Sequence, residues 1–271
     1  MGLTVERALL REQLIRLARE DSSAYTGLVM KDNVGRRFVQ EPLHQSWHDH
    51  IRFARSIDRF AGILAPWGHG KSSQVLGITT YAIGRLPEIR IKYVCNRDDY
   101  AKQRVSKARE IIERDPDFQA VFPGVMPIRE PGQSKDEWSR SAFRVRNRGM
   151  SIDSTMSAHS VLSTGIGGRC DLLVFDDPLD LRNAVEFPTM REKVFDTITN
   201  VWMSRLTENG MVIFICTRWH EEDVIGKLLQ NPRWAWLVQR VPDDCHVIES
   251  ELVLPGWGDS VKLPPIVRRV A

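Results

Sequence analysis

A short apolar run followed by a glycine-rich loop constrains this chain more than any other part of its sequence. The run is Phe60–Leu64, and the next eight residues read Ala65-Pro66-Trp67-Gly68-His69-Gly70-Lys71-Ser72. The two glycines let backbone N–H groups turn towards one point, and a helix that begins at the lysine adds partial positive charge there. A strand, such a loop and a helix in this order predict a phosphate-binding loop. It is a variant, because alanine stands where the usual pattern has its first glycine.

This loop predicts binding of Mg-ATP. Lys71 supplies a full positive charge for the β- and γ-phosphates, and the Ser72 hydroxyl is placed to reach Mg²⁺. An ordinary glycine-rich turn is the alternative, but the strand before the loop and the helix after it favour the nucleotide site. The residues that we expect to line the nucleotide are Pro66, Trp67, Gly68, His69, Gly70, Lys71, Ser72 and Ser73.

A second motif supplies the carboxylates that a phosphate-binding loop needs. The apolar run Leu172–Phe175 ends in Asp176 and Asp177, which is a Walker B pattern. We expect Asp176 to hold the metal and Asp177 to orient the attacking water, although glutamate is commoner at the second position. The alternative is an acidic turn before Pro178. The nucleotide hypothesis requires Asp176 and the loop lysine to converge from the tips of two adjacent strands.

A third apolar run, Val212–Cys216, ends abruptly in the polar segment Thr217-Arg218-Trp219-His220. Ligands of open parallel sheets lie beyond the carboxyl ends of the strands, so the threonine hydroxyl is placed to sense the γ-phosphate. For the arginine and the histidine, a functional role and a solvated loop remain equally open.

Strands and helices alternate around these motifs, which predicts a mostly parallel, three-layer α/β sheet. An amphipathic helix over Leu3–Arg19 precedes them, with leucines that we expect to pack on the core or on a neighbouring subunit. The leucines are Leu9, Leu10, Leu14 and Leu17. Besides the three apolar runs, the pattern predicts helices over Pro42–Ser56, Lys71–Gly84, Asp98–Asp115 (with an acidic cap) and about Ala184–Leu206, and a strand over Arg90–Cys95.

Two regions are harder to interpret. Between Phe118 and Arg169 the pattern weakens, and Phe143–Arg146 is compatible with an edge strand or a hairpin. The segment Pro242–Ala271 is rich in proline and glycine, and we expect it to leave the sheet as a linker. The predicted organisation is an N-terminal helix and arm (1–40), one ATPase domain (41–241) and a C-terminal tail (242–271).

Composition adds few constraints. A hydrophobic content of 42% supports a globular core, and a formal net charge of +3 permits a phosphate-rich partner without requiring one. No apolar run approaches the length of a membrane span, so we expect an intracellular protein without a membrane partner. The four cysteines lie far apart and are expected to be buried free thiols: Cys95, Cys170, Cys216 and Cys245.

Three of these blocks resemble the large terminase subunits of tailed double-stranded DNA bacteriophages. Those subunits carry a Pro-x-Gly-His-Gly-Lys-Ser loop, an Asp-Asp-Pro end of Walker B and a Thr-Arg-Trp-His segment, which correspond here to Pro66–Ser72, Asp176–Pro178 and Thr217–His220. The likeness covers about Pro42–Asn231 and continues through His220-Glu221-Glu222-Asp223. It implies a P-loop NTPase fold of the additional-strand, helicase-like type, with ATP and Mg²⁺ as ligands.

The resemblance also implies residue roles. Thr217 corresponds to the ATPase coupling motif, and Gln45 resembles the adenine-contacting element ahead of the loop, although a surface glutamine is as good an interpretation. Some family members place an arginine four residues before the loop lysine, where this chain has Trp67. Arg169, in the segment Thr164–Arg169, resembles the arginine that other members donate across a subunit boundary; a plain surface arginine is the alternative.

The family implies partners and a cellular place. We expect ATP hydrolysis to drive double-stranded DNA into a procapsid, with a portal protein, a small terminase subunit and a homo-oligomeric ring as partners. This would take place in the host cytoplasm, transiently at the portal. The family's nuclease domain has no counterpart after Asp259, so we expect no DNA cleavage by this chain.

Some alternatives remain open. They are a helicase-like or repair ATPase, a non-hydrolysing ATP-binding module and, less well supported, a small-molecule kinase. DNA-contacting residues are not readable: two basic sets are candidates, but solvated charges are the commoner interpretation. The sets are Lys102, Arg104, Lys107 and Arg109, and Arg144, Arg146 and Arg148.

Overall fold

One mixed sheet organises the chain. The computed structural model describes residues 2–32, 34–126, 128, 141–145, 153–163, 167–242, 247–258 and 260–267. Within these ranges nine strands form a single sheet in the order β3-β4-β2-β5-β6-β1-β7-β8-β9. The six strands from β4 to β7 are parallel, and β3, β8 and β9 join antiparallel at the two edges. The strands are β1 (Phe60–Leu64), β2 (Ile91–Cys95), β3 (Ala142–Phe143), β4 (Met156–Ser160), β5 (Cys170–Asp176), β6 (Leu206–Cys216), β7 (Trp234–Arg240), β8 (Val247–Val253) and β9 (Val261–Val267).

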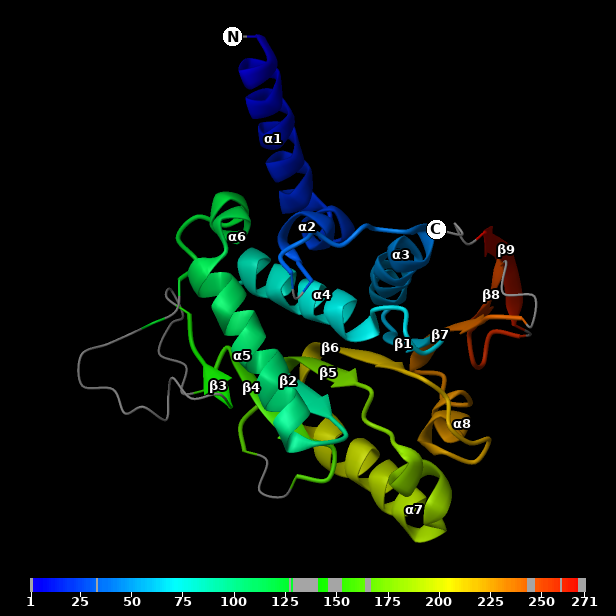
Figure 1. The fold of residues 1–271 in the computed structure, drawn as a ribbon. Helices are drawn as coiled ribbons and strands as arrows, with labels where there is room; N and C mark the ends of the chain where they lie inside the picture. Colours follow the sequence, from blue (N-terminus) through cyan, green and yellow to red (C-terminus); the bar gives the residue numbers. More distant parts are fainter. Residues whose placement is uncertain are drawn as a thin grey trace.

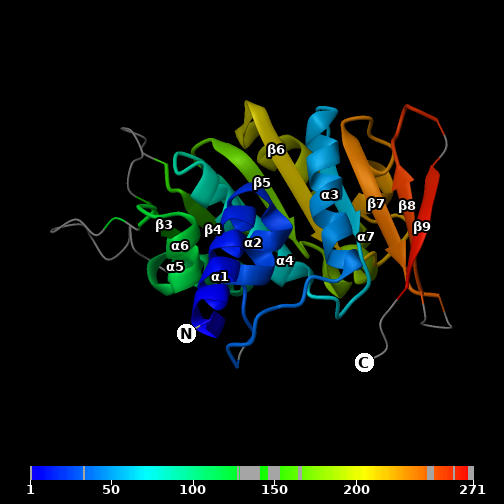
Figure 2. The ribbon, with the colours of Figure 1, turned by 90° about the horizontal axis from the view of Figure 1, so that it is seen from above.

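Helices cover both faces of this sheet. Figures 1 and 2 show α2, α3, α4 and α5 on one face and α7 with α8 on the other. The predicted three-layer arrangement is therefore confirmed. The helices are α1 (Gly2–Glu20), α2 (Ser22–Val29), α3 (Pro42–Ser56), α4 (Lys71–Arg85), α5 (Asp98–Arg114), α6 (Pro116–Val121), α7 (Pro188–Asp196) and α8 (Val224–Leu228), with π-helical turns η1 (Arg182–Glu186) and η2 (Thr197–Trp202) and a 3-10 turn η3 (Met203–Arg205).

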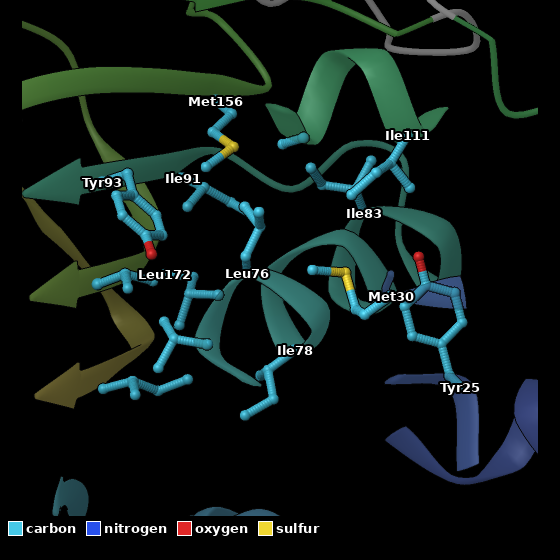
Figure 3. Packing of buried hydrophobic residues seen from close by; sticks show 14 of the residues in the cluster. Tyr25, Met30, Leu76, Ile78, Ile83, Ile91, Tyr93, Ile111, Met156 and Leu172 are labelled. Carbon is cyan, nitrogen blue, oxygen red and sulfur yellow. The ribbon is translucent and has the colours of Figure 1, made fainter. Parts of the chain in front are cut away.

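Alternation along the buried strands builds two cores, one on each face. In β1, Ile63 belongs to the core under α4, whereas the next residue, Leu64, belongs to the core under α7 and α8. Figure 3 shows Leu76 of α4 beside Ile91 and Leu172 of the sheet. Because both faces of the central strands are covered, most of their residues are apolar, as in parallel strands buried on both sides; Lys92 of β2 is a buried exception.

Several predicted elements agree with the structure almost residue for residue. The bounds of α3 and β1 are those expected, and α1, α4 and α5 differ by one or two residues at an end. The predicted acidic cap of α5 is wrong, however. Its N-cap is Arg97, and the two acidic residues Asp98 and Asp99 lie in the first turn instead. There they still interact favourably with the helix dipole.

Two expectations about longer segments need correction. The helix expected over 184–206 is confirmed over 188–205, where α7, η2 and η3 follow one another without a gap, but Phe187 separates this helix from η1 and its geometry changes along its length. The segment 242–271 was expected to leave the sheet, but its two hydrophobic stretches form β8 and β9, which extend the sheet beyond β7. The edge-strand interpretation of Phe143 is confirmed by β3, which pairs with β4.

The N-terminal helix packs on the body through a narrow contact. Ala18 is fully buried and Ile15 packs against the core, but the predicted leucine stripe does not. These leucines are 48–56% exposed: Leu9, Leu10, Leu14 and Leu17. The prediction that these leucines pack on the core is therefore wrong. Figure 1 shows α1 projecting from the body. No described helix is both long and apolar enough to cross a membrane.

Gly62 of β1 permits the neighbouring strand to carry a tryptophan. A Cβ atom at this position would lie 2.2 Å from the Trp236 indole, which covers the glycine from β7. We expect Gly62→Ala to lower the free energy of unfolding by about 1–3 kcal/mol, because a rigid indole cannot yield without repacking the core. Denaturant unfolding measures this cost. In a Trp236→Ala background the cost should shrink, and an equal cost in both backgrounds would contradict the clash.

Candidate nucleotide-binding site

The glycine-rich loop lies between β1 and α4, at the carboxyl edge of the sheet. β1 ends at Leu64 and α4 begins at Lys71, as the motif predicts. Gly68 and Gly70 have φ values of 82° and 73°, in the left-handed region that residues with a Cβ rarely adopt. The loop therefore enters the helix through a turn that depends on glycine, and the free N–H groups of the first turn of α4 lie beside it.

Lys71 connects this loop to Thr217, which follows β6, the strand next to β1. Its side chain is buried, and Nζ donates to Pro66 O at 3.1 Å, to Ala65 O at 3.4 Å and to the Thr217 hydroxyl at 2.9 Å. The ammonium group is thus held at the mouth of the loop by neutral oxygens only. The Asp177 carboxylate is close enough to interact with this charge, but no carboxylate accepts one of these three hydrogen bonds, which suits the ammonium group to a phosphate.

Ser72 and Asp176, the two predicted metal ligands, are in direct contact. The serine hydroxyl donates to Asp176 Oδ1 at 2.9 Å, and the Tyr93 hydroxyl donates to Asp176 Oδ2 at 2.8 Å. Asp176 is 3% exposed, and each of its oxygens is oriented by a hydroxyl donor, one of which, Tyr93, is fully buried. Burial raises the pKa of Asp176 above the ordinary carboxyl value, against the opposing effect of the nearby Arg104 charge.

The strands that carry Lys71 and Asp176 are not adjacent, which corrects the expectation from sequence. β6 lies between β1 and β5, paired in parallel with both. The start of α4 and Asp176 still come together, because the loop and the first turn of α4 reach across the tip of β6, where Ser72 contacts Asp176. This order places Thr217, which follows β6, between the glycine-rich loop and the carboxylates of Asp176 and Asp177.

Asp177, next to Thr217, has an unusual backbone conformation and a fixed side chain. Its φ is 45°, which is uncommon for a residue with a side chain, and its Oδ1 accepts a hydrogen bond from Thr217 N at 3.1 Å. Burial raises the pKa of Asp177, with the Lys71 charge lowering it and the Asp176 charge raising it. A strained residue with a desolvated carboxylate is a frequent signature of a functional position.

The two carboxylates, the serine and the lysine fit a magnesium–triphosphate group. Among the described residues, no cluster of three histidine, cysteine or acidic side chains could hold a metal by itself. Mg²⁺ is commonly held by one or two protein oxygens together with phosphate oxygens and water, which matches Ser72 and Asp176. A pocket of about 240 Å³ opens here between these residues, Asp177 and Thr217.

A second pocket, of about 400 Å³, lies on the other side of the loop. It is bounded by the start of α3, the loop and the hairpin of β8 and β9. His44 accepts a hydrogen bond from Glu41 N on Nδ1, so its Nε2 carries the proton and donates to His69 O at 3.2 Å. His69 Nε2 is buried beside this pocket without a hydrogen-bond partner. Phe38, Leu43 and Ile248 give the pocket the apolar surface that an adenine ring would need.

Gln45, the residue expected to contact adenine, does not line this pocket. Its amide donates to Asp49 one turn further along α3, at 2.9 Å. The neighbouring His44 is the α3 side chain that touches the loop. Ser73, at the second residue of α4 after the lysine, does line the pocket. An adenine contact by Gln45 therefore stays a prediction.

Arg169 lies far from these groups within one chain. It is exposed and immediately precedes β5, whereas Asp176 ends the same strand, about 20 Å away for a strand of this length. A role in the site of its own chain is therefore excluded by distance, and donation to a neighbouring chain stays a prediction. Thr164–Ile166, the start of the segment that carries this arginine, lies outside the described residues.

The segment after Thr217 is ordered by buried hydrogen bonds. Asp223 is fully buried, and its Oδ2 accepts from Trp219 N and His220 N while its Oδ1 caps α8. His220 Nδ1 also lies 3.1 Å from Arg191 of α7. Arg218 donates only to Glu221 O, at the surface. His220 is thus a contact between the site and α7, while Arg218 fits the solvated interpretation.

The basic candidates for DNA contact separate in the structure. Lys102 and Lys107 form ion pairs with Asp98 and Glu110 on α5 itself, whereas Arg104 turns into the pocket beside Asp176. Arg146 and Arg148 lie outside the described residues, as does Cys245. The other three cysteines are buried and free, as predicted.

Sequence reasoning missed three residues of the site: His44, Tyr93 and Arg104. Tyr93 is one of five buried residues in β2, and nothing in an apolar strand distinguishes a tyrosine that packs from one that donates to a carboxylate. Tyr93 is the middle residue of β2 and is paired with Val174, two residues before Asp176, so strand pairing and not a local signal identifies it. Arg104 was counted only as one charge in a basic run.

Tyr93→Phe tests the alignment of Asp176. Removing the hydroxyl takes a donor from a buried carboxylate oxygen, so we expect a loss of about 1.5–3 kcal/mol in unfolding free energy. We also expect hydrolysis to need a roughly 10- to 100-fold higher Mg²⁺ concentration, because losing a residue that hydrogen-bonds to a metal ligand typically weakens metal binding by this factor. Tyr25→Phe is the matched control, since its buried hydroxyl donates to Thr80 instead. It should lose stability with no change in Mg²⁺ requirement; equal requirements in both variants would contradict the assignment.

Comparison with known proteins supports the fold. No model of a known protein family matches the chain, and no curated protein matches it either. Among solved structures, the large terminase of bacteriophage HK97 superposes with a TM-score of 0.56 at 15% sequence identity, over 83% of this chain. This chain spans 44% of the length of that protein. An ATPase-domain mutant of the Thermus phage P74-26 large terminase gives a TM-score of 0.42 at 14% identity, over 67% of this chain and 68% of that one. The first similarity shows a shared fold, and the second is too weak to add to it.

Proposed function

We propose that this chain is the ATPase motor part of a large terminase subunit, which hydrolyses Mg-ATP to move double-stranded DNA into a viral procapsid. The fold shared with the HK97 large terminase supports the proposal. The observation that carries it is the convergence of Lys71, Asp176 and Asp177 around Thr217 at one edge of the sheet. The terminase-like motifs in the sequence coincide with these residues.

The chemistry follows from the positions of the side chains. Lys71 and the first turn of α4 attract the β- and γ-phosphates, and Ser72 with Asp176 would hold Mg²⁺. The metal supplies charge neutralisation of the phosphate oxygens. Asp177 is positioned to orient a water molecule for attack on the γ-phosphate, because its carboxylate lies in the same pocket and is fixed by Thr217 N. Thr217 touches both the lysine and the aspartate, so it is placed to respond to loss of the γ-phosphate.

Partners follow from the proposed function. Double-stranded DNA is the substrate to be moved, and a portal-bearing procapsid, a small terminase subunit and further copies of this chain in a ring complete the machine. The work would take place in the host cytoplasm, at the portal.

Turnover tests the proposal. We would measure phosphate release by the purified chain alone, with double-stranded DNA, and with DNA plus portal-bearing procapsids, and score DNA protected from nuclease inside the procapsids. A terminase motor should release phosphate fastest in the complete mixture and protect DNA. A helicase-like ATPase should be stimulated by DNA alone and separate its strands. A regulatory module that only binds ATP should release none.

Arg169 is the candidate arginine finger of the ring. In the assembled state, Arg169→Ala should lower ATP hydrolysis about 1,000-fold or more, in line with the effect of arginine fingers elsewhere. Because the arginine would act on the next subunit, the isolated chain should hydrolyse ATP at the same slow rate with or without it. Full activity of the assembled Arg169→Ala protein would remove the idea.

A further inference from the structure

Arg104 occupies a position that its place in the sequence does not reveal. It lies on α5, among basic residues that face solvent, but it lines the pocket shared by Ser72, Asp176 and Asp177. Its neighbours one turn away point elsewhere: Lys102 pairs with Asp98, and Lys107 pairs with Glu110. One residue of the basic run is therefore directed to the catalytic edge of the sheet.

The contacts of Arg104 leave part of its hydrogen-bonding capacity unused. Nε lies 3.6 Å from Asp176 Oδ2, which is an ion-pair distance but too long for a hydrogen bond. That oxygen already accepts from Tyr93, and the other accepts from Ser72. Nε is buried and has no hydrogen-bond partner. A buried donor in this state is destabilising, and an anionic acceptor that entered the pocket would satisfy it.

The loop supplies few other positive charges near this pocket, so the charge of Arg104 matters for binding phosphates. At the loop position where some terminases carry an arginine, this chain has Trp67, whose side chain is 84% exposed and uncharged. Lys71 approaches the pocket from the loop, held by Thr217. Arg104 lines the pocket from α5 beside Asp176, and Thr217, which holds Lys71, lines the same pocket, so both cations lie near the space that the phosphates would take. A guanidinium is always protonated and presents planar donors that match phosphate oxygens.

We propose that Arg104 contacts the terminal phosphates of ATP bound to its own chain and stabilises the charge that develops on them during hydrolysis. This inference rests on the proposed ATPase function and assigns to Arg104 an arginine role within the subunit. It also removes Arg104 from the residues that could contact DNA. Arg169 of a neighbouring chain would then act in addition to Arg104.

Three variants of the full chain test this assignment: Arg104→Gln, Arg104→Lys and the control Lys102→Gln, which removes an equal charge from a residue of α5 that does not line this pocket. Each is measured for steady-state ATP hydrolysis and for affinity towards fluorescent ATP and ADP analogues, after thermal melting has verified the fold. We expect Arg104→Gln to lower kcat about 10- to 100-fold and to weaken ATP binding more than ADP binding. Arg104→Lys should recover part of kcat, and Lys102→Gln should match the wild type.

Mixing of subunits distinguishes the chain on which Arg104 acts. An assembled mixture of Arg104→Gln and Lys71→Ala proteins should be no more active than its Arg104→Gln component alone, because each nucleotide site lacks one group of its own chain. Recovery of activity in the mixture would show that the arginine is donated to a neighbour and would overturn the assignment. Wild-type kcat in Arg104→Gln would overturn it as well. A wild-type protein that releases no phosphate would instead refute the proposed function, which separates the two failures.

Discussion

Replacing Lys71 with alanine should abolish measurable ATP hydrolysis, with a fall of at least about 100- to 1,000-fold in kcat/KM, as for other losses of a preorganised charge at a reacting phosphate or oxyanion. The side chain is 5% exposed and donates to three oxygens of the loop and Thr217, so its position is fixed before any nucleotide arrives. Phosphate release and nucleotide binding by fluorescence measure the effect. The variant should bind the triphosphate more weakly as well.

A control for this variant removes a lysine of the same charge elsewhere. Lys107→Ala loses an exposed ion pair with Glu110 on α5, which contributes little to stability. It should hydrolyse ATP at the wild-type rate. If Lys71→Ala retained a tenth or more of the wild-type activity while folded, the loop would not be the phosphate site.

Asp177→Asn should lower kcat by roughly 100- to 10,000-fold while ATP binding is kept, because the change removes the base and little else. Asparagine tolerates a left-handed backbone better than most residues, so a φ of 45° is not a source of added strain. Its amide oxygen can still accept from Thr217 N, as the carboxylate does at 3.1 Å. Single-turnover hydrolysis and analogue binding separate the chemical step from affinity.

Asp180→Asn is the matched control for this second variant. Asp180 lines the same pocket, and its Oδ1 accepts from Asn183 N, a cap that asparagine can also provide. Loss of charge at this position should leave hydrolysis near the wild-type rate. Equal losses in both variants would point to the total charge of the pocket and not to a base at Asp177.

The sequence predicted the elements whose signal is local. β1, the loop and α4 follow from an apolar run, two glycines and a lysine, and the bounds of α3 follow from Pro42 and the spacing of its apolar residues. The carboxylates and Thr217 were found for the same reason, since each stands directly after a buried strand. These signals lie within about ten residues of the group that they identify.

What the sequence could not predict depends on pairing across long distances. The tail after residue 242 has proline and glycine in a linker-like density, yet β8 and β9 are stabilised by pairing with β7. The position of β6 between β1 and β5 is a matter of strand order, which apolar runs do not encode. Arg104 and Tyr93 were missed because only the packing of α5 and β2 against β5 brings them to Asp176.

The central place of β6 has a mechanical consequence. The strand is hydrogen-bonded to a parallel neighbour on both sides, so it cannot slide without breaking two ladders at once. We therefore expect a shift of Thr217 to be passed on to the loop that follows β6. In this loop, His220 and Glu222 contact Arg191 of α7, and beyond it Lys227 of α8 pairs with Glu192 of α7. These contacts tie the loop and α8 to α7, which lies between two π-helical turns. We therefore expect the sheet to stay fixed during turnover and the corner formed by α7 and α8 to be the part that shifts.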